Sequence, residues 1–244
     1  MALIQVEFRS QTLQRSVPLQ VILPVENKNA PQKFKTLYLL HGLHGSCVDW
    51  VANTRIRRWA QAQNLAVVMP SGDNSFYVDK PLSGNCYGEF IGRELVEVTR
   101  RMFPLSDKRE DTFLGGLSMG GFGALRNGLK YRETFGAVIS LSGAVDIFNM
   151  PMTPEEAAFG EAVFGAGAAA SDKNPRVLIK LLKGRGDLPR IYLCCGTEDS
   201  LLPQSRAIRA LLEDAGFDVT YEEGPGKHDW DYWDANIQKV LNWL

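Results

Sequence analysis

The sequence predicts an α/β fold with a mostly parallel, doubly wound sheet and helices on both of its faces. From residue 36 onward, short apolar runs alternate with longer stretches of helical period, which is the pattern of successive right-handed crossovers. The chain has 244 residues, of which 45% are hydrophobic, and this suits one domain over 1–244. One serine also stands between glycines where an apolar run passes directly into a helical stretch.

The first strands differ from the later ones. Residues 3–8 and 12–23 alternate between apolar and polar side chains, which predicts an antiparallel pair. Pro18 and Pro24 indicate a sheet edge and a strand end, because proline cannot donate to a central ladder. The run at 36–40, TLYLL, is typical of a strand buried on both faces.

The later elements alternate in type. Helices are expected near 49–63, 87–103, 119–131, 199–215 and 230–243. Strands are expected near 65–69, 111–115, 136–141, 190–195 and 218–223.

The segment 146–175 interrupts this alternation. It is rich in alanine and proline, offers no strand pattern and is long for a connection. It is therefore a candidate lid insertion, and the alternative is a pair of surface helices that only covers the sheet.

Composition excludes several classes of partner. The 27 basic residues nearly balance the 28 acidic ones, so no nucleic-acid footprint is visible. No stretch approaches the roughly 18 apolar residues of a membrane span, and the first ten residues do not resemble a secretion signal. We expect a cytoplasmic protein with a small-molecule substrate, and a homo-oligomer is compatible with the sequence.

The cysteines predict neither disulfides nor a metal site. Cys47, Cys86, Cys194 and Cys195 lack C-x-x-C spacing and form no cluster with histidines. Free thiols are expected.

Ser118 is the candidate nucleophile. It lies in Gly116-Leu117-Ser118-Met119-Gly120, which fits the G-x-S-x-G nucleophile elbow of α/β-hydrolases. Glycines two residues before and after the serine leave room where strand and helix backbones crowd each other. The apolar run before the motif and the small residues after it provide the strand-to-helix context that the motif requires.

A serine hydroxyl needs a base near neutral pH, and histidine is the usual one. The chain has three histidines. His41 and His44 lie in HGLHG after an early strand, whereas His228 lies in a glycine-rich loop after the last strand. That loop opens at the carboxyl edge of the sheet, as the serine turn does, so His228 is the predicted base.

The third member of a triad must orient and stabilise the imidazole. Glu198 and Asp199 both follow the strand predicted at 190–195, and either fits the chain order Ser, acid, His.

An oxyanion formed on attack needs two backbone N–H donors. The elbow supplies that of Met119, and the loop after the strand at 36–40 predicts Leu43 as the second.

In this order, LLHGLHGS, GLSMGGFGAL, CGTED and GKHDWDYW resemble the esterase D group of serine hydrolases, in its tributyrin-esterase or acetyl-esterase branch. The likeness extends from about residue 37 to the C-terminus. It implies an α/β-hydrolase fold of about eight strands, no metal, no cofactor and an acyl-enzyme on Ser118. The resemblance of CGTED to the acid turn of this group favours Asp199 over Glu198.

The resemblance leaves the substrate open. The group includes S-formylglutathione hydrolases and feruloyl or acetyl-xylan-type esterases, although this chain is shorter than the former and its elbow reads GLSMGG. We expect a carboxylesterase for acyl groups from acetyl to butyryl. The walls of the acyl pocket are expected from the apolar side chains of 146–175, which are Phe148, Met150, Met152, Phe159 and Phe164. A non-catalytic binding module or a peptidase on the same fold is the alternative from another class.

Trp230, Trp233 and Trp243 recur at near-helical spacing. This predicts that they anchor the last helix and do not bind an aromatic ligand.

Overall fold

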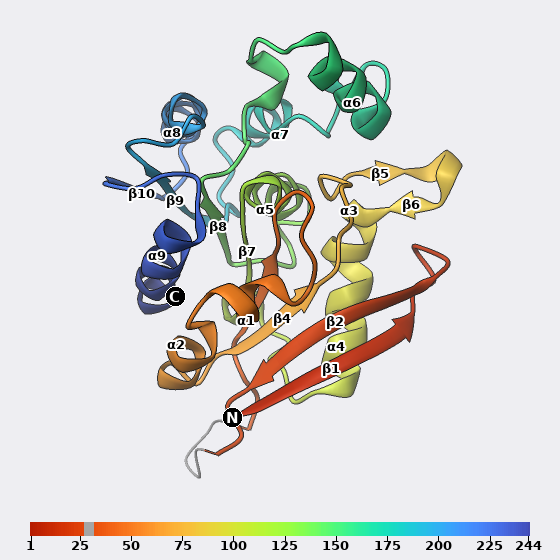
Figure 1. Ribbon diagram of the computed structural model, residues 1–244, viewed down its shortest axis with the longest axis vertical. Coiled ribbons are helices and arrows are strands. Elements are labelled where there is room, and N and C mark those ends of the chain that lie inside the picture. The colour runs from red at the N-terminus through yellow and green to blue at the C-terminus, as the bar shows by residue number, and fades with distance from the viewer. Residues whose placement is uncertain (27–31) are drawn as a thin grey trace.

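The computed structural model describes residues 1–26 and 32–244, and its centre is an eight-stranded sheet in the order β1-β2-β4-β3-β7-β8-β9-β10 (Figure 1). The strands are β1 (Ala2–Arg9), β2 (Ser16–Leu23), β3 (Thr36–Leu40), β4 (Ala66–Pro70), β7 (Thr112–Leu117), β8 (Ala137–Leu141), β9 (Arg190–Gly196) and β10 (Val219–Gly224). β2 is antiparallel to both β1 and β4, whereas the neighbours from β4 to β10 pair in parallel. The predicted α/β fold with a mostly parallel sheet is confirmed.

Helices cover both faces of this sheet. They are α1 (Asp49–Asn53), α2 (Ile56–Ala62), α3 (Tyr87–Glu89), α4 (Leu95–Met102), α5 (Met119–Lys130), α6 (Pro154–Phe164), α7 (Pro175–Leu182), α8 (Leu202–Asp214) and α9 (Trp230–Trp243). Successive side chains of a strand point to opposite faces, so β3 contributes Leu37 and Leu39 to the core under α2 and α9. Tyr38 and Leu40 enter the core under α4, α5 and α8.

Two predicted helices are interrupted. The expected helix at 49–63 is two helices, because Thr54 is extended between them and its hydroxyl accepts from the Ile56 N–H. In the expected helix at 87–103, a π-helical stretch (Phe90–Glu94) separates α3 from α4. Gly92 lies there against the Tyr131 ring, where a Cβ would come within 2.1 Å of that ring. The π-helical stretch thus coincides with a close approach between Gly92 and the Tyr131 ring.

Two elements were not predicted. A short hairpin joins β5 (Asp79–Lys80) and β6 (Asn85–Cys86), and α7 follows the segment 146–175. The two-residue strands are too short to show a hydrophobic period. In α7 the period is present, with Leu178, Ile179 and Leu182 buried on one face, but it begins where the segment 146–175 ends and was not recognised as a separate helix. In Figure 1 the hairpin lies near α6, the helix of the 146–175 segment that stands away from the sheet.

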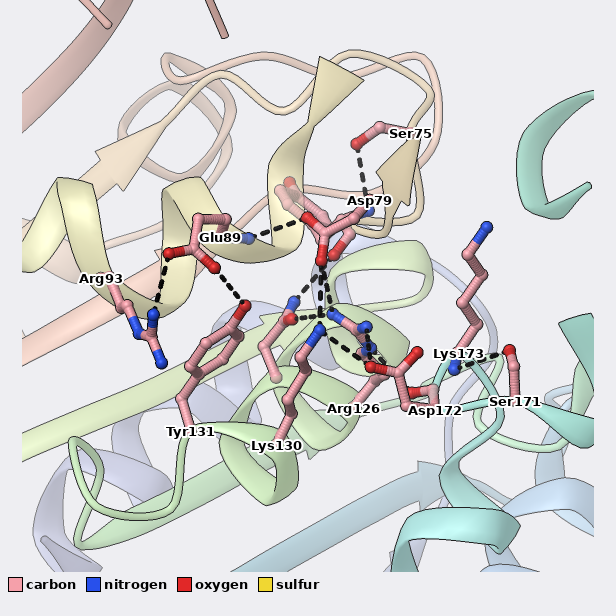
Figure 2. Close-up of polar contacts among 12 residues, drawn as sticks. Ser75, Asp79, Glu89, Arg93, Arg126, Lys130, Tyr131, Ser171, Asp172 and Lys173 are labelled. Carbon is pink, nitrogen blue, oxygen red and sulfur yellow. Dashed lines mark hydrogen bonds and ion pairs between the residues drawn. The ribbon is translucent and has the colours of Figure 1, made fainter. Parts of the chain in front are cut away.

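A buried ion network attaches this segment to α5 (Figure 2). Arg126 of α5 is only 1% exposed, and its Nη2 lies 3.2 Å from Oδ2 of Asp172. Its Nε also donates to the Asp172 carbonyl oxygen at 3.0 Å. Lys130 bridges Asp172 and Asp79, at 2.8 and 3.3 Å. Because a buried charge without its partner is costly, this network holds the segment and the hairpin to α5.

Candidate active site

Ser118 occupies the turn between β7 and α5. Its backbone has φ 53° and ψ −119°, a left-handed conformation that is uncommon for a residue with a side chain. The turn is tight, because a Cβ on Gly116 would lie 2.5 Å from the Gly120 backbone. The turn thus directs the Ser118 side chain outward at the carboxyl edge of the sheet, where it is partly exposed.

Gly120→Ala is expected to destabilise the protein by about 3 kcal/mol, because the added Cβ would lie 2.5 Å from the Leu40 carbonyl oxygen, in rigid backbone. Gly160→Ala in α6 is the matched control. No atom lies within 4 Å of its added Cβ, so alanine should stabilise that helix by about 0.5–1 kcal/mol. Urea unfolding of both variants measures the difference. Equal effects of the two substitutions would contradict this account of the elbow.

The structure brings His228 and Asp199 to Ser118. His228 lies in the loop between β10 and α9, and its Nε2 is 2.9 Å from the Ser118 Oγ. Its Nδ1 is 2.8 Å from Oδ2 of Asp199, which follows β9. The Asp199 carboxylate is fully buried, whereas the His228 ring is 34% exposed. The hydroxyl, the imidazole and the carboxylate therefore form one continuous hydrogen-bonded chain.

Asp199 is held in its ionised form. Burial by itself would raise the pKa of Asp199, but hydrogen bonds from His228 and the Leu201 N–H outweigh it, and the pKa lies below its ordinary value. Glu198 is exposed, and its N–H donates to the Gly226 carbonyl oxygen. The structure thus places Asp199, and not Glu198, against the imidazole.

The two residues predicted to supply oxyanion donors adjoin the elbow in different ways. Gly42 packs on the elbow, since a Cβ there would lie 3.5 Å from the Ser118 Cβ, and Leu43 follows it. Met119 is the first residue of α5, so its N–H has no acceptor within the helix. Among the residues that the structure describes, neither the Leu43 N–H nor the Met119 N–H donates to a protein acceptor. The prediction of these two N–H groups as oxyanion donors is compatible with this lack of protein acceptors.

The two other histidines have different surroundings. His41 is buried, its Nδ1 donates to the Gly42 carbonyl oxygen at 2.7 Å and its Nε2 accepts the Gly72 N–H at 2.8 Å. Burial lowers the pKa of His41, so the ring stays neutral and fixes this loop. His44 is exposed on the same loop with φ 63°, and its N–H donates to Asn74.

Ser118 and His228 open into a cavity of about 640 Å³. Its lining comprises Gly42, Leu43, His44, Gly45, Asp49, Leu117, Ser118, His228, Asp229, Trp230 and Trp233. The prediction that Trp230 and Trp233 only anchor α9 is therefore incomplete, whereas Trp243 packs on Tyr192. Sequence reasoning also missed Asp49 and Asp229. The only available signal was that Asp229 and Trp230 directly follow His228.

The segment 146–175 does not line this cavity. The three phenylalanines expected to form the acyl wall pack elsewhere: Phe148 lies 4.8 Å from Phe164, and Phe159 lies 6.3 Å from Phe76, measured between ring centroids. Phe164 also packs on Phe122 of α5. The expectation that these rings enclose the group bound at Ser118 is wrong for this cavity, because aromatic packing draws them to the outer side of α5.

Within the described part of the chain, no group of three His, Cys, Asp or Glu side chains could hold a metal ion. The described helices include none that is long and apolar enough to cross a membrane.

Comparison with known proteins points to ester hydrolysis. Residues 10–244 match the model of a family described as "Putative esterase". The chain is 41% identical to an acetyl esterase of Caldicellulosiruptor saccharolyticus, over 100% of this chain and 98% of the relative. The fluorophosphonate-binding serine hydrolase F (FphF) of Staphylococcus aureus superposes with TM-score 0.87 at 28% identity, covering 99% of this chain and 97% of that one. An S-formylglutathione hydrolase of the same organism gives TM-score 0.85 at 28% identity, covering 99% and 98%.

Proposed function

The chain belongs to this esterase family and is a carboxylic ester hydrolase of the serine type, and we propose that it cleaves esters of small acyl groups, acetyl to butyryl, with Ser118 as nucleophile. The observation that carries the assignment of the residues is the hydrogen-bonded chain from the Ser118 Oγ through His228 to Asp199, with distances of 2.9 and 2.8 Å. The acyl preference rests on the acetyl esterase relative.

In the first half of the reaction, the Ser118 Oγ attacks the ester carbonyl carbon while its proton passes to Nε2 of His228. The Leu43 and Met119 N–H groups donate to the oxyanion that forms. Asp199 holds Nδ1–H and stabilises the imidazolium. The tetrahedral intermediate then expels the alcohol, which takes the proton from Nε2, and leaves the acyl group on Ser118.

In the second half, water attacks the acyl carbon and gives its proton to Nε2 of His228. Collapse of this second intermediate returns the proton to the Ser118 Oγ and releases the carboxylic acid. Asp199 stays ionised throughout, since its pKa is already below the ordinary range. Steady-state hydrolysis of p-nitrophenyl acetate, with a pre-steady-state burst of p-nitrophenol when deacylation is slow, tests this sequence of steps.

The acyl preference is tested with p-nitrophenyl acetate, butyrate, hexanoate and octanoate. We expect kcat/KM to be highest from acetyl to butyryl and to fall over several carbons, because each methylene contributes only about 1–3 kcal/mol of discrimination. Trp230→Ala should shift the maximum to longer chains, because Trp230 lines the cavity. Phe159→Ala is the control, because this exposed ring of α6 lies outside the cavity.

A wild-type maximum at octanoyl would overturn the acyl assignment. A shift caused by Phe159→Ala and not by Trp230→Ala would instead identify 146–175 as a lid over the acyl group. The geometry favours the other interpretation, in which the segment covers α5.

Hydrolysis of a glutathione thioester is the second candidate. It is favoured by the likeness to an S-formylglutathione hydrolase at TM-score 0.85. Comparing kcat/KM for S-formylglutathione with that for p-nitrophenyl acetate decides between the two. A value about 100-fold higher for the thioester would replace the proposed substrate class.

The cytoplasm is the proposed compartment. Cys194 and Cys195 are neighbours in β9, and both are buried free thiols in the described structure. Free thiols are typical of a reducing compartment.

A further inference from the structure

The charges around the Ser118 cavity are of one sign. Asp49 and Asp229 line it, and no lysine or arginine does so among the described residues. The remaining titratable side chains of the lining are the imidazoles of His44 and His228. Lys227 lines a neighbouring cleft, which shares Asp229 with this cavity. A substrate group in the cavity therefore meets two carboxylates and no fixed cation.

Local contacts hold both carboxylates in place. Asp49 begins α1, and its Oδ1 accepts from the Ser46 hydroxyl at 3.2 Å. Its Oδ2 rests against Gly45, where a Cβ would come within 2.2 Å, so the carboxylate lies on the loop that carries Leu43. Asp229 is the N-cap of α9 and accepts the Tyr232 N–H at 3.0 Å. These bonds keep the charges at the cavity and leave both groups without a cationic partner among the described residues.

Two tryptophans of α9 form the aromatic part of the wall. Trp230 contacts Trp50 and Trp233 edge-to-face, with centroid separations of 5.5 and 5.1 Å. Trp233 in turn contacts the His228 ring at 5.0 Å. Indole faces attract cations and accept neutral apolar groups, whereas they offer nothing to an anion.

We propose that this cavity selects esters that are uncharged or positively charged beyond the scissile bond and rejects anionic ones, with Asp49 as a specificity-determining residue. The inference rests on the proposed function, because it places the substrate in the Ser118 cavity. An anion there would be repelled by both carboxylates in a partly desolvated site, whereas a cation would be attracted. On this basis glutathione thioesters, which carry two carboxylates and one ammonium group, are poor substrates.

The test uses three acetates of 2-substituted ethanols that differ in the terminal group: 3,3-dimethylbutyl acetate (neutral), acetylcholine (cationic) and 2-acetoxyethanesulfonate (anionic). Each kcat/KM is divided by the rate constant for imidazole-catalysed hydrolysis of the same ester at the same salt concentration. Imidazole is an uncharged nucleophile, so this division removes intrinsic reactivity without adding a charge effect of its own. At about 0.01 M salt we expect the anionic ester to fall at least about tenfold below the neutral one. The cationic ester should equal or exceed the neutral one, and the differences should shrink at about 1 M salt.

Asp49→Asn should raise the anionic-to-neutral ratio about threefold, because one of the two repelling charges is gone. Glu133→Gln is the matched control: it removes an exposed carboxylate from the turn between α5 and β8, at the opposite edge of the sheet. Its ratio should equal that of wild type. The salt series needs wild type alone, so it tests the inference even if a variant folds poorly.

Equal normalised rates for the anionic and neutral esters in wild type would overturn the inference and leave the esterase function standing. If Asp49→Asn changes the anionic-to-neutral ratio no more than Glu133→Gln does, Asp49 is not a specificity-determining residue. No turnover of the three acetates and none of p-nitrophenyl acetate would remove the proposed function itself, and the inference with it.

Discussion

Ser118→Ala is expected to lower kcat/KM for p-nitrophenyl acetate by about 10⁵- to 10⁶-fold. The hydroxyl is the group that would carry the acyl intermediate, and no other described side chain replaces it in the chain to His228. The melting temperature should stay close to that of wild type, because the side chain is partly exposed and loses one hydroxyl.

Labelling by a fluorophosphonate gives an independent readout, since the reagent reacts with an activated serine. Wild type and Ser83→Ala, a control at an exposed serine near the hairpin, should both be labelled, and Ser118→Ala should not. Full labelling of Ser118→Ala with an unchanged fold would show that another residue is the nucleophile.

His228→Ala is expected to cost nearly as much as the loss of Ser118. Serine and histidine act as one unit, so the double variant Ser118→Ala/His228→Ala should be no less active than either single one. The measurement is kcat/KM for the same ester at a pH where wild type is most active. Losses that multiply in the double variant would mean that His228 works independently of Ser118.

Asp199→Asn should be milder than His228→Ala but still severe, about 10⁴-fold, because an amide favours the wrong imidazole tautomer. Glu198→Gln is the matched control: it neutralises the adjacent carboxylate, which is exposed and donates only its backbone N–H to Gly226. A larger loss for Glu198→Gln than for Asp199→Asn, at equal stability, would exchange the two assignments.

The sequence predicted the order and type of most elements, because burial on both faces leaves a strand with a continuous apolar run. The strand at 36–40 was predicted with the bounds that β3 has, and its side chains are buried throughout. The prediction of continuous helices was weaker where the structure departs from the helical pattern of the sequence. Thr54 ends a helix whose hydrophobic pattern continues, and a π-helical stretch lies where Gly92 packs on the Tyr131 ring.

The candidate triad could be named from the sequence because each member follows a strand of the parallel part of the sheet. The carboxyl ends of those strands meet at one edge, so Ser118, Asp199 and His228 were expected near one another without any distances. The choice between Glu198 and Asp199 was different. It depended on a family resemblance, since adjacent residues at a strand end share the same general position, and only the local turn decides which carboxylate reaches the imidazole.

By itself the sequence determined the α/β class, the parallel sheet and the three chemical groups of the candidate triad, because hydrophobic period and motif spacing are local properties of the chain. Only the tertiary structure decided what surrounds Ser118. It turned Phe148, Phe159 and Phe164 toward one another and toward Phe76 and Phe122. It also brought Asp49 from α1 and Trp230 from α9 to the cavity wall. A cavity wall joins residues that are distant in sequence, and their meeting depends on how helices pack across the sheet, which no local pattern records.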